Sequence, residues 1–307
     1  MNIKVACPYN VVTGGIELLH QVAHELNKYD NIYADIWYIF DSNKTDIPVE
    51  YQMYGNSVNN VICPDDILLF PEIWAGLASV SQFAGHKKII YWESVDNYFG
   101  HTRRQDWFKF EPSTIHLSQT EYSNRFLEQF KIPADNIIEV TDYINDEFFT
   151  CQDEPWVRHP IVLYNPVKGF EFTDKLIMYA PDIDFQPISG MNRQQIIELM
   201  RKSMVWVDFG NFPGKDRLPR EAAICGMCLI TGKHGSAKFV KDLAIPPIYK
   251  FSDANYSDLK FISQLIRDIF NQFEYHTQNF IEYREHIKEE KILFEQGVYK
   301  LVRKLCQ

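Results

Sequence analysis

The feature that most constrains the fold of this chain is the regular alternation of short apolar segments with segments of helical period. In the first half, a helix is predicted to begin near Ile16, because apolar residues recur there with a period close to 3.6. Strands separated by helices form parallel sheets that helices cover on both faces. The segments predicted to be strands are 3–7, 34–40, 66–70, 88–92 and 114–118.

The alternation pauses between Glu147 and His159 and then resumes. The second series of predicted strands comprises 161–164, 183–188, 204–209 and 228–231. We therefore expect an α/β protein with two Rossmann-like domains of similar size, the first covering 1–150. Ligands of such folds bind beyond the carboxyl ends of the strands, so the loops at those ends are where functional residues are expected.

Charge and hydrophobicity indicate which partners and which cellular compartment to expect. The net charge of −10 argues against a nucleic-acid partner, because no basic surplus exists to displace counterions. The chain opens with a predicted strand rather than a signal peptide, and no apolar run approaches about 18 residues, so a cytoplasmic location is expected. Cys225 and Cys228 have the Cys-x-x-Cys spacing of metal or redox sites, but we interpret them as small core residues.

The segment from Gly214 to Ala237 carries the strongest functional signal. It is predicted to form a charged loop, a short helix with Pro219 in its first turn, a buried strand and a glycine-bearing loop. Glu221 is expected to face the crevice, where a carboxylate accepts hydrogen bonds from both hydroxyls of a ribose. A solvated loop with surface ion pairs is the alternative interpretation.

The same segment supplies cations and backbone amides suited to phosphate. Lys215, Arg217 and Arg220 are candidates to neutralise a diphosphate, and arginine offers a two-pronged contact. Gly235 and Ser236 follow a predicted strand, so their backbone amides are candidates to cradle the phosphates at a helix start. Together with Glu221, these groups predict a nucleotide-sugar site.

The order Arg220-Glu221-Ala222-Ala223, followed by Gly226, Ile230 and Gly232, resembles the donor-binding signature of GT-B glycosyltransferases. The resemblance implies two domains that face each other across a cleft, with the donor in the second domain, 151–290. It also implies that the last helix, 291–307, crosses back to the first domain. Within the site, it implies that Glu221 holds the donor ribose and that Gly235 and Ser236 cradle its diphosphate.

Other short motifs extend this resemblance to both halves. Lys168-Gly169 resembles the Lys-Gly of the family, which implies that Lys168 meets the donor phosphates. Gly14 and Gly15 resemble its N-terminal glycine loop, which approaches the transferred sugar and the acceptor. Retaining members often carry an earlier glutamate where this chain has Pro213, and Asp216 or Asp208 is the candidate to do related work.

Two carboxylates of the first half are candidates for catalysis. Glu93 and Asp96 follow a predicted strand, so either is positioned to act as general base on an acceptor hydroxyl if the reaction inverts. Capping of the next element is the alternative for both. Arg103 and Arg104 are interpreted as a solvated basic loop, with contact to an anionic acceptor as the alternative. Arg217 is the candidate to stabilise the departing diphosphate.

Asp182 and Asp184 have the spacing of a metal-binding Asp-x-Asp, but they lie at the beginning of a predicted strand rather than after one. We therefore expect no metal and no other cofactor, with the nucleotide-sugar serving as co-substrate. The expected function is metal-independent transfer of a sugar to a hydroxyl of a glycan or lipid-linked saccharide, as in bacterial surface-polysaccharide synthesis. Peripheral association with the inner face of the membrane is compatible with such an acceptor.

Two other functions remain open on the sequence. One is a sugar-nucleotide epimerase or hydrolase on the same fold, which would turn over the donor without an acceptor. The other is a noncatalytic partner subunit that binds nucleotide-sugar, an alternative kept open by Pro213 at the position of the earlier glutamate.

Overall fold

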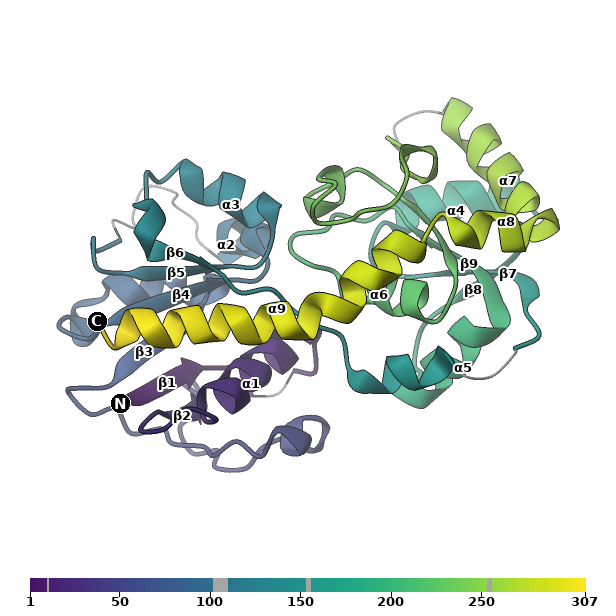
Figure 1. The fold of residues 1–307 in the computed structure, drawn as a ribbon. Helices are drawn as coiled ribbons and strands as arrows, with labels where there is room; N and C mark the ends of the chain where they lie inside the picture. Colours follow the sequence, from purple (N-terminus) through teal and green to yellow (C-terminus); the bar gives the residue numbers. More distant parts are fainter. Residues whose placement is uncertain (10, 102–109, 153–155, 253–255) are drawn as a thin grey trace. The chain divides into compact units, whose positions relative to one another are not determined.

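The computed structural model describes residues 1–9, 11–101, 110–152, 156–252 and 256–307, drawn as a coloured ribbon in Figure 1. Arg103 and Arg104 lie outside these ranges. The chain divides into two compact units. Unit 1 comprises Met1–Tyr143, Pro213–Lys215 and Lys291–Gln307, and unit 2 comprises Ile144–Phe212 and Asp216–Glu290. Ile144 and Phe148 are core residues of unit 2, so the change of unit falls before residue 150.

Unit 1 is built on a parallel sheet with the strand order β2-β1-β3-β4-β5-β6 (Figure 1). Five of these strands coincide with predicted ones, and their nearly unbroken apolar sequences fit a sheet buried on both faces. The sequence did not predict β6, which has three residues and a half-exposed, edge-strand pattern. The bounds are β1 Asn2–Ala6, β2 Tyr33–Trp37, β3 Ile67–Pro71, β4 Lys88–Trp92, β5 Ile115–Ser118 and β6 Ile137–Glu139.

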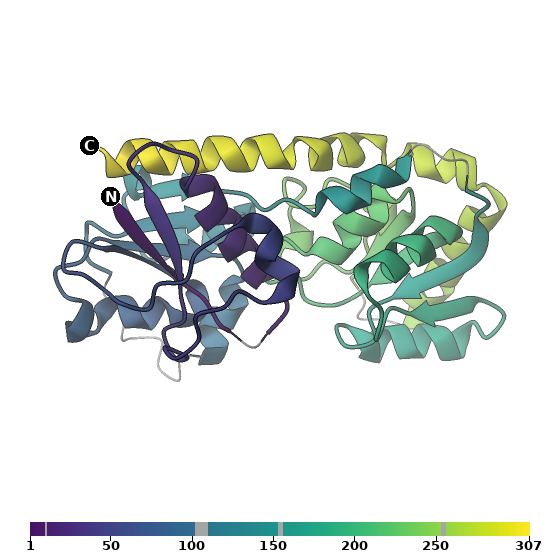
Figure 2. The same cartoon turned by 90° about the horizontal axis from the view of Figure 1, so that it is seen from below.

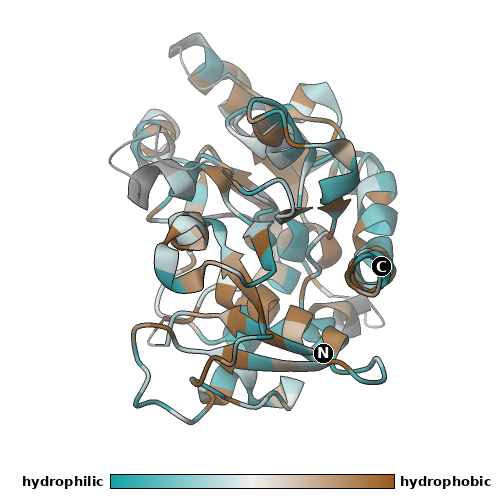
Figure 3. Cartoon of the chain, turned by 90° about the vertical axis from the view of Figure 1, so that its left-hand side faces the viewer, coloured by the Kyte–Doolittle hydropathy of each residue, from teal (hydrophilic) through white to brown (hydrophobic). Residues whose placement is uncertain are grey.

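Helices cover the two faces of this sheet. Helix α1 (Gly14–Leu26) packs into one core layer, whereas α2 (Val95–His101) and α3 (Glu121–Glu128) lie with the opposite layer. Thr13 caps α1 by accepting a hydrogen bond from the Ile16 amide, so this helix begins two residues before the predicted start. Hydrophobic colours gather on the strands in Figure 3, as expected for a sheet enclosed by helices.

Unit 2 is built on a second parallel sheet, with the order β10-β9-β7-β8. Its strands are β7 His159–Tyr164, β8 Asp184–Pro187, β9 Ser203–Asp208 and β10 Cys228–Thr231. Its helices include α4 Phe170–Tyr179, α5 Arg193–Lys202, α6 Arg217–Ile224, α7 Tyr256–Asn271 and α8 Phe273–Gln278. Cys225 and Cys228 are both buried in its core, and burial raises the pKa of the Cys228 thiol to about 12. That environment keeps the thiol protonated and unreactive.

Helix α9 (Ile281–Leu305) begins in unit 2 and ends in unit 1. Its later residues complete the unit 1 core layer that contains α1, through Phe294, Val298 and Leu301. Gly297 lets the helix approach β6 closely, since a Cβ at that position would lie 2.5 Å from the Glu139 carbonyl oxygen. Figure 2 shows α9 in yellow along one side of the unit 1 sheet. None of the helices formed by the described residues has the length and hydrophobicity needed to cross a bilayer.

Candidate functional site

In unit 2, the loops after β7 and β9 are in backbone contact at the carboxyl ends of adjacent strands. Gly169, which precedes α4, has a φ of +69°, and a Cβ there would lie 2.2 Å from the Gly210 amide nitrogen. A Cβ on Gly210 would in turn lie 2.4 Å from Cγ of Lys168. Only glycine fits at both places, and the Lys168 side chain therefore lies directly over the β9 loop.

This contact brings Lys168 together with two carboxylates predicted from the sequence, Asp208 and Asp216. The Lys168 ammonium forms an ion pair with Asp216 and lies 4.8 Å from the centre of the Phe212 ring. Asp208, at the end of β9, is 2% exposed, and its Oδ1 accepts a hydrogen bond from the Gly210 amide at 2.9 Å. Burial raises the pKa of Asp208 to about 7 and also raises the pKa of Asp216, while Lys168 opposes both shifts.

The raised pKa of Asp208 predicts a specific pH dependence of stability. An Asp carboxyl in the unfolded chain has a pKa near its ordinary value of 3.8, so between about pH 4 and 7 the folded state binds one proton more than the unfolded state at this residue. The stabilisation of the folded state by this proton is therefore fully present below pH 4 and is lost as the pH rises toward 7. Against Asp208→Asn, which does not titrate, wild-type stability should fall by up to about 1.4 kcal/mol per pH unit in that window.

Urea unfolding of both proteins at pH 5, 6, 7 and 8 measures this difference. The Asn side chain keeps an acceptor for the Gly210 amide, so the variant is a close structural match. Parallel stability curves for the two proteins would contradict the raised pKa.

The glycine loop after β10 pairs with the loop after β9. Gly235 has a φ of +58° and pairs with Phe212, and a Cβ there would lie 2.0 Å from the Phe212 carbonyl oxygen. The Ser236 amide donates to that carbonyl at 2.8 Å. In this structure the Ser236 amide therefore joins the loops after β9 and β10, and the role of Gly235 and Ser236 toward a phosphate stays a prediction.

Arg220, which the sequence predicts to be a phosphate contact, is buried in an ion pair within unit 2. Its side chain is 1% exposed and pairs with Glu290 of α9 at 2.6 Å, and its Nε donates to the Asp216 carbonyl at 3.2 Å. Arg220 therefore stabilises the interior of unit 2. The sequence analysis missed Glu290; its signal was a glutamate on the same helical face as the apolar positions Tyr283 and Ile287.

Arg217 and Glu221 lie on α6, which begins at Arg217 rather than near Arg220, the start that the sequence predicts. Arg217 is therefore in the first turn and Glu221 in the second. Both side chains are half-buried. Their roles toward a diphosphate and a ribose stay predictions.

Unit 1 carries a second group of predicted residues at the carboxyl ends of its strands. Glu93 directly follows β4 and is 7% exposed, and its Oε2 lies 2.6 Å from where a Cβ on Gly15 would be. The structure thus brings Glu93 against the glycine pair Gly14 and Gly15 at the start of α1. Asp96, in the first turn of α2, accepts a hydrogen bond from the Tyr122 hydroxyl at 2.7 Å.

Lys215 belongs to unit 1, whereas Lys168 and Asp216 belong to unit 2. Its amide donates to Gln119 Oε1 at 2.9 Å, and its ammonium donates to Thr141 Oγ1 at 2.8 Å. The sequence placed Lys215 among the donor-phosphate contacts because it is a cation in the charged loop after a predicted strand. In the structure it contacts the loops that follow β5 and β6, and its role toward a diphosphate stays a prediction.

The sequence analysis also missed Glu72, the residue that directly follows β3. It is 3% exposed, and its Oε2 accepts a hydrogen bond from the Glu93 amide at 3.1 Å. Burial raises the pKa of Glu72 to about 7, against the effect of hydrogen bonds from Glu93, Ser94 and Asn97. The signal was available, since a glutamate after an apolar predicted strand occupies the same position as Glu93 after the next one.

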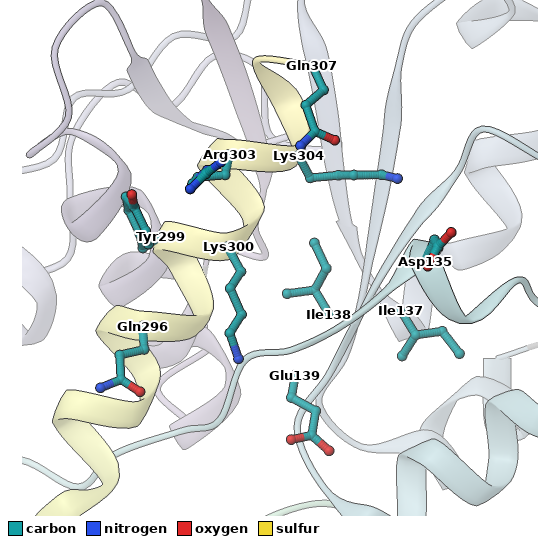
Figure 4. A pocket seen from close by; sticks show the side chains of 10 residues that line it. All are labelled: Asp135, Ile137, Ile138, Glu139, Gln296, Tyr299, Lys300, Arg303, Lys304 and Gln307. Atoms are coloured by element: carbon teal, nitrogen blue, oxygen red, sulfur yellow. The ribbon is translucent and has the colours of Figure 1, made fainter.

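Among the described residues, no group of three or more His, Cys, Asp or Glu side chains is arranged to hold a metal ion. Asp182 of the Asp-x-Asp sequence accepts hydrogen bonds from Arg267 at 2.8 and 2.9 Å. A groove of about 740 Å³ in unit 1, shown in Figure 4, lies between β6 and the end of α9. Lys300, Arg303 and Glu139 contribute to its walls, and it contains no site residue predicted from the sequence.

Comparison with known proteins identifies the fold. No protein-family model matches the sequence, and no curated protein does. Several solved structures match across 99% of the chain. One is Anabaena HepE with UDP-glucose, with a TM-score of 0.64, 10% sequence identity and 100% of that chain covered. Another is the lipopolysaccharide outer core galactosyltransferase WaaB, with a TM-score of 0.65, 12% identity and 100% of that chain covered. The E. coli trehalose-6-phosphate synthase with UDP-2-fluoro-glucose also matches, with a TM-score of 0.67, 9% sequence identity and 99% of that chain covered. The chain therefore has the GT-B fold.

Proposed function

We propose that this protein is a glycosyltransferase that moves a sugar from a nucleotide-sugar, most simply a UDP-sugar, to a hydroxyl of a glycan or lipid-linked acceptor. Structures of the same fold contain UDP, UDP-glucose and UDP-2-fluoro-glucose. The observation that carries the proposal is the Lys168–Asp208–Asp216 cluster, set at the carboxyl ends of β7 and β9, where ligands of such sheets bind.

In this proposal, the Lys168 ammonium and the Arg217 guanidinium stabilise the negative charge that develops on the departing diphosphate. Asp216 holds the Lys168 ammonium in place before the donor binds. Transfer needs no metal, because these side chains supply the positive charge that a divalent cation supplies elsewhere. Glu221 accepts hydrogen bonds from the ribose hydroxyls.

The acceptor is assigned to unit 1, at the turn from Glu93 to Asn97 and the adjoining glycine pair Gly14–Gly15. We name Glu93–Asn97 the acceptor turn. It carries both carboxylates, Glu93 and Asp96, that are candidates to take the acceptor proton in an inverting reaction. We further propose a cytoplasmic location, with peripheral membrane association where the acceptor is lipid-linked.

Binding and turnover experiments on the purified protein test this function. UDP and UDP-sugars at 100 times their dissociation constant should stabilise it by about 2.7 kcal/mol, which thermal unfolding detects, and GDP and CMP serve as comparison nucleotides. Release of UDP that requires an added saccharide acceptor and persists in EDTA is the expected result. Turnover without acceptor would instead indicate an epimerase or hydrolase. No stabilisation by any nucleotide would favour a noncatalytic protein.

A further inference from the structure

We propose that Glu72 is a positioning residue for the acceptor turn, Glu93–Asn97. The catalytic consequence of this inference rests on the proposed function. The contacts by which Glu72 holds the turn lie within unit 1 and do not depend on that function. Glu72 follows β3, and the acceptor turn follows β4, its neighbour in the sheet. The buried carboxylate thus reaches sideways across the carboxyl edge of the sheet.

The Glu72 carboxylate hydrogen-bonds to its own backbone amide and to three groups of the acceptor turn. In the turn, it accepts from the amides of Glu93 and Ser94 and from the side chain of Asn97. A carboxylate offers only acceptor atoms, so it can satisfy several converging N–H donors at once. Without these bonds, the buried amides of this partly buried turn would lose their partners at a cost of about 1–3 kcal/mol each.

The acceptor turn is braced on another side by backbone pairing. Ser94 pairs with Gly214, the Val95 amide donates to the Pro213 carbonyl at 2.9 Å, and a Cβ on Gly214 would lie 1.7 Å from the Glu93 carbonyl oxygen. The turn is therefore held between Glu72 and the Pro213–Gly214 segment of unit 1. Because the Glu93 side chain rests against Gly15, loss of one brace would shift the Glu93 carboxylate along that glycine surface.

Glu72→Gln tests this role with the smallest change of shape. Glutamine presents an NH₂ group to one of the turn's N–H donors, so the turn loses an acceptor and gains a repulsive contact. We expect kcat/KM for the acceptor to fall about 10- to 100-fold, the scale expected from a displacement near 1 Å. The dissociation constant of UDP should stay within about twofold, because Lys168 and Asp216 belong to unit 2.

Hydrogen–deuterium exchange supplies a readout that does not depend on activity. In Glu72→Gln, the amides of Glu93 and Ser94 should exchange at least about tenfold faster, while those of β1 and β5 should keep wild-type protection. Asn97→Ala removes one partner of the same carboxylate from an exposed position, and it should move both readouts in the same direction by a smaller factor.

Asp66→Asn is the matched control. Asp66 is 2% exposed and precedes β3, whereas Glu72 follows it, and it caps the Cys63 amide at 2.8 Å. This variant removes a buried carboxylate at the opposite end of the strand and should leave the exchange of the acceptor turn and the acceptor KM unchanged.

The outcomes separate this inference from the proposed function. If wild-type protein neither binds nor turns over any nucleotide-sugar, the proposed function fails, and exchange alone decides whether Glu72 braces the turn. Unchanged exchange at Glu93 and Ser94 in Glu72→Gln would overturn the inference, whatever the activity. Equal losses of UDP affinity and of kcat/KM for the acceptor would also overturn the inference, because they would indicate general damage to the fold.

Discussion

Replacement of Lys168 by Ala should lower kcat/KM for the nucleotide-sugar about 10²- to 10³-fold, equivalent to about 2.7–4 kcal/mol of transition-state stabilisation. The ammonium is held over the β9 loop and paired with Asp216, with 27% of its side chain exposed, so it is accessible to a phosphate. The dissociation constant of UDP should rise as well, since charge-assisted contacts to phosphate exceed neutral hydrogen bonds in strength. Steady-state kinetics and calorimetric titration with UDP measure the two effects.

Lys175→Ala is the matched control for this experiment. Lys175 lies on α4 in the same unit and forms an exposed ion pair with Glu171 at 3.0 Å. Its loss should leave kcat/KM within about twofold of wild type and change stability by less than about 0.5 kcal/mol. Equal effects of the two substitutions, or none from Lys168→Ala, would remove Lys168 from the site.

Replacement of Arg220 by Ala should cost about 3–5 kcal/mol of unfolding free energy. The guanidinium and its partner Glu290 are 1% and 4% exposed, so the substitution leaves a buried carboxylate without its counter-charge. Urea denaturation measures the loss, and we expect a shifted midpoint with an unchanged slope. Glu290→Ala should cost a similar amount, for the reciprocal reason.

Two further proteins show whether the pair itself causes this loss. The double variant Arg220→Met with Glu290→Leu replaces both charges by apolar groups and should recover most of the stability. Arg267→Ala removes an exposed arginine that pairs with Asp182 and should cost less than about 1 kcal/mol. If Arg220→Ala lowers the unfolding free energy by less than about 1 kcal/mol, the ion pair does not stabilise unit 2, and ligand contact becomes the favoured role of Arg220.

Local sequence pattern was sufficient for most of the fold. Segments such as Lys88–Trp92 and Cys228–Thr231 are strands with the predicted bounds, because short apolar runs between helical segments leave little alternative in a parallel sheet. Strand β6 was not predicted because its three residues, of which only Ile138 is buried, carry too little pattern. Its strand state depends on pairing with β5, a contact that sequence spacing does not reveal.

The candidate site shows a similar limit. Glycines and charged residues near the strand ends predicted that Lys168 and Asp216 lie at the carboxyl edge of the unit 2 sheet and that Glu93 lies at that edge of the unit 1 sheet, since parallel strands deliver their following loops to one edge. Burial and pairing were not predictable from the same pattern. Arg220 and Lys215 lie five residues apart, yet one is enclosed with Glu290 and the other contacts Gln119 and Thr141. Long-range partners decide such roles.

The membership of α9 in both cores affects how the chain matures on the ribosome. Most of unit 1 is synthesised first, but its apolar layer lacks Phe294, Val298 and Leu301 until residues 291–305 have been made. Unit 2 can bury most of its own core earlier. We therefore expect unit 1, although most of it is made first, to stay protease-sensitive in nascent chains until residues 291–305 have left the ribosome.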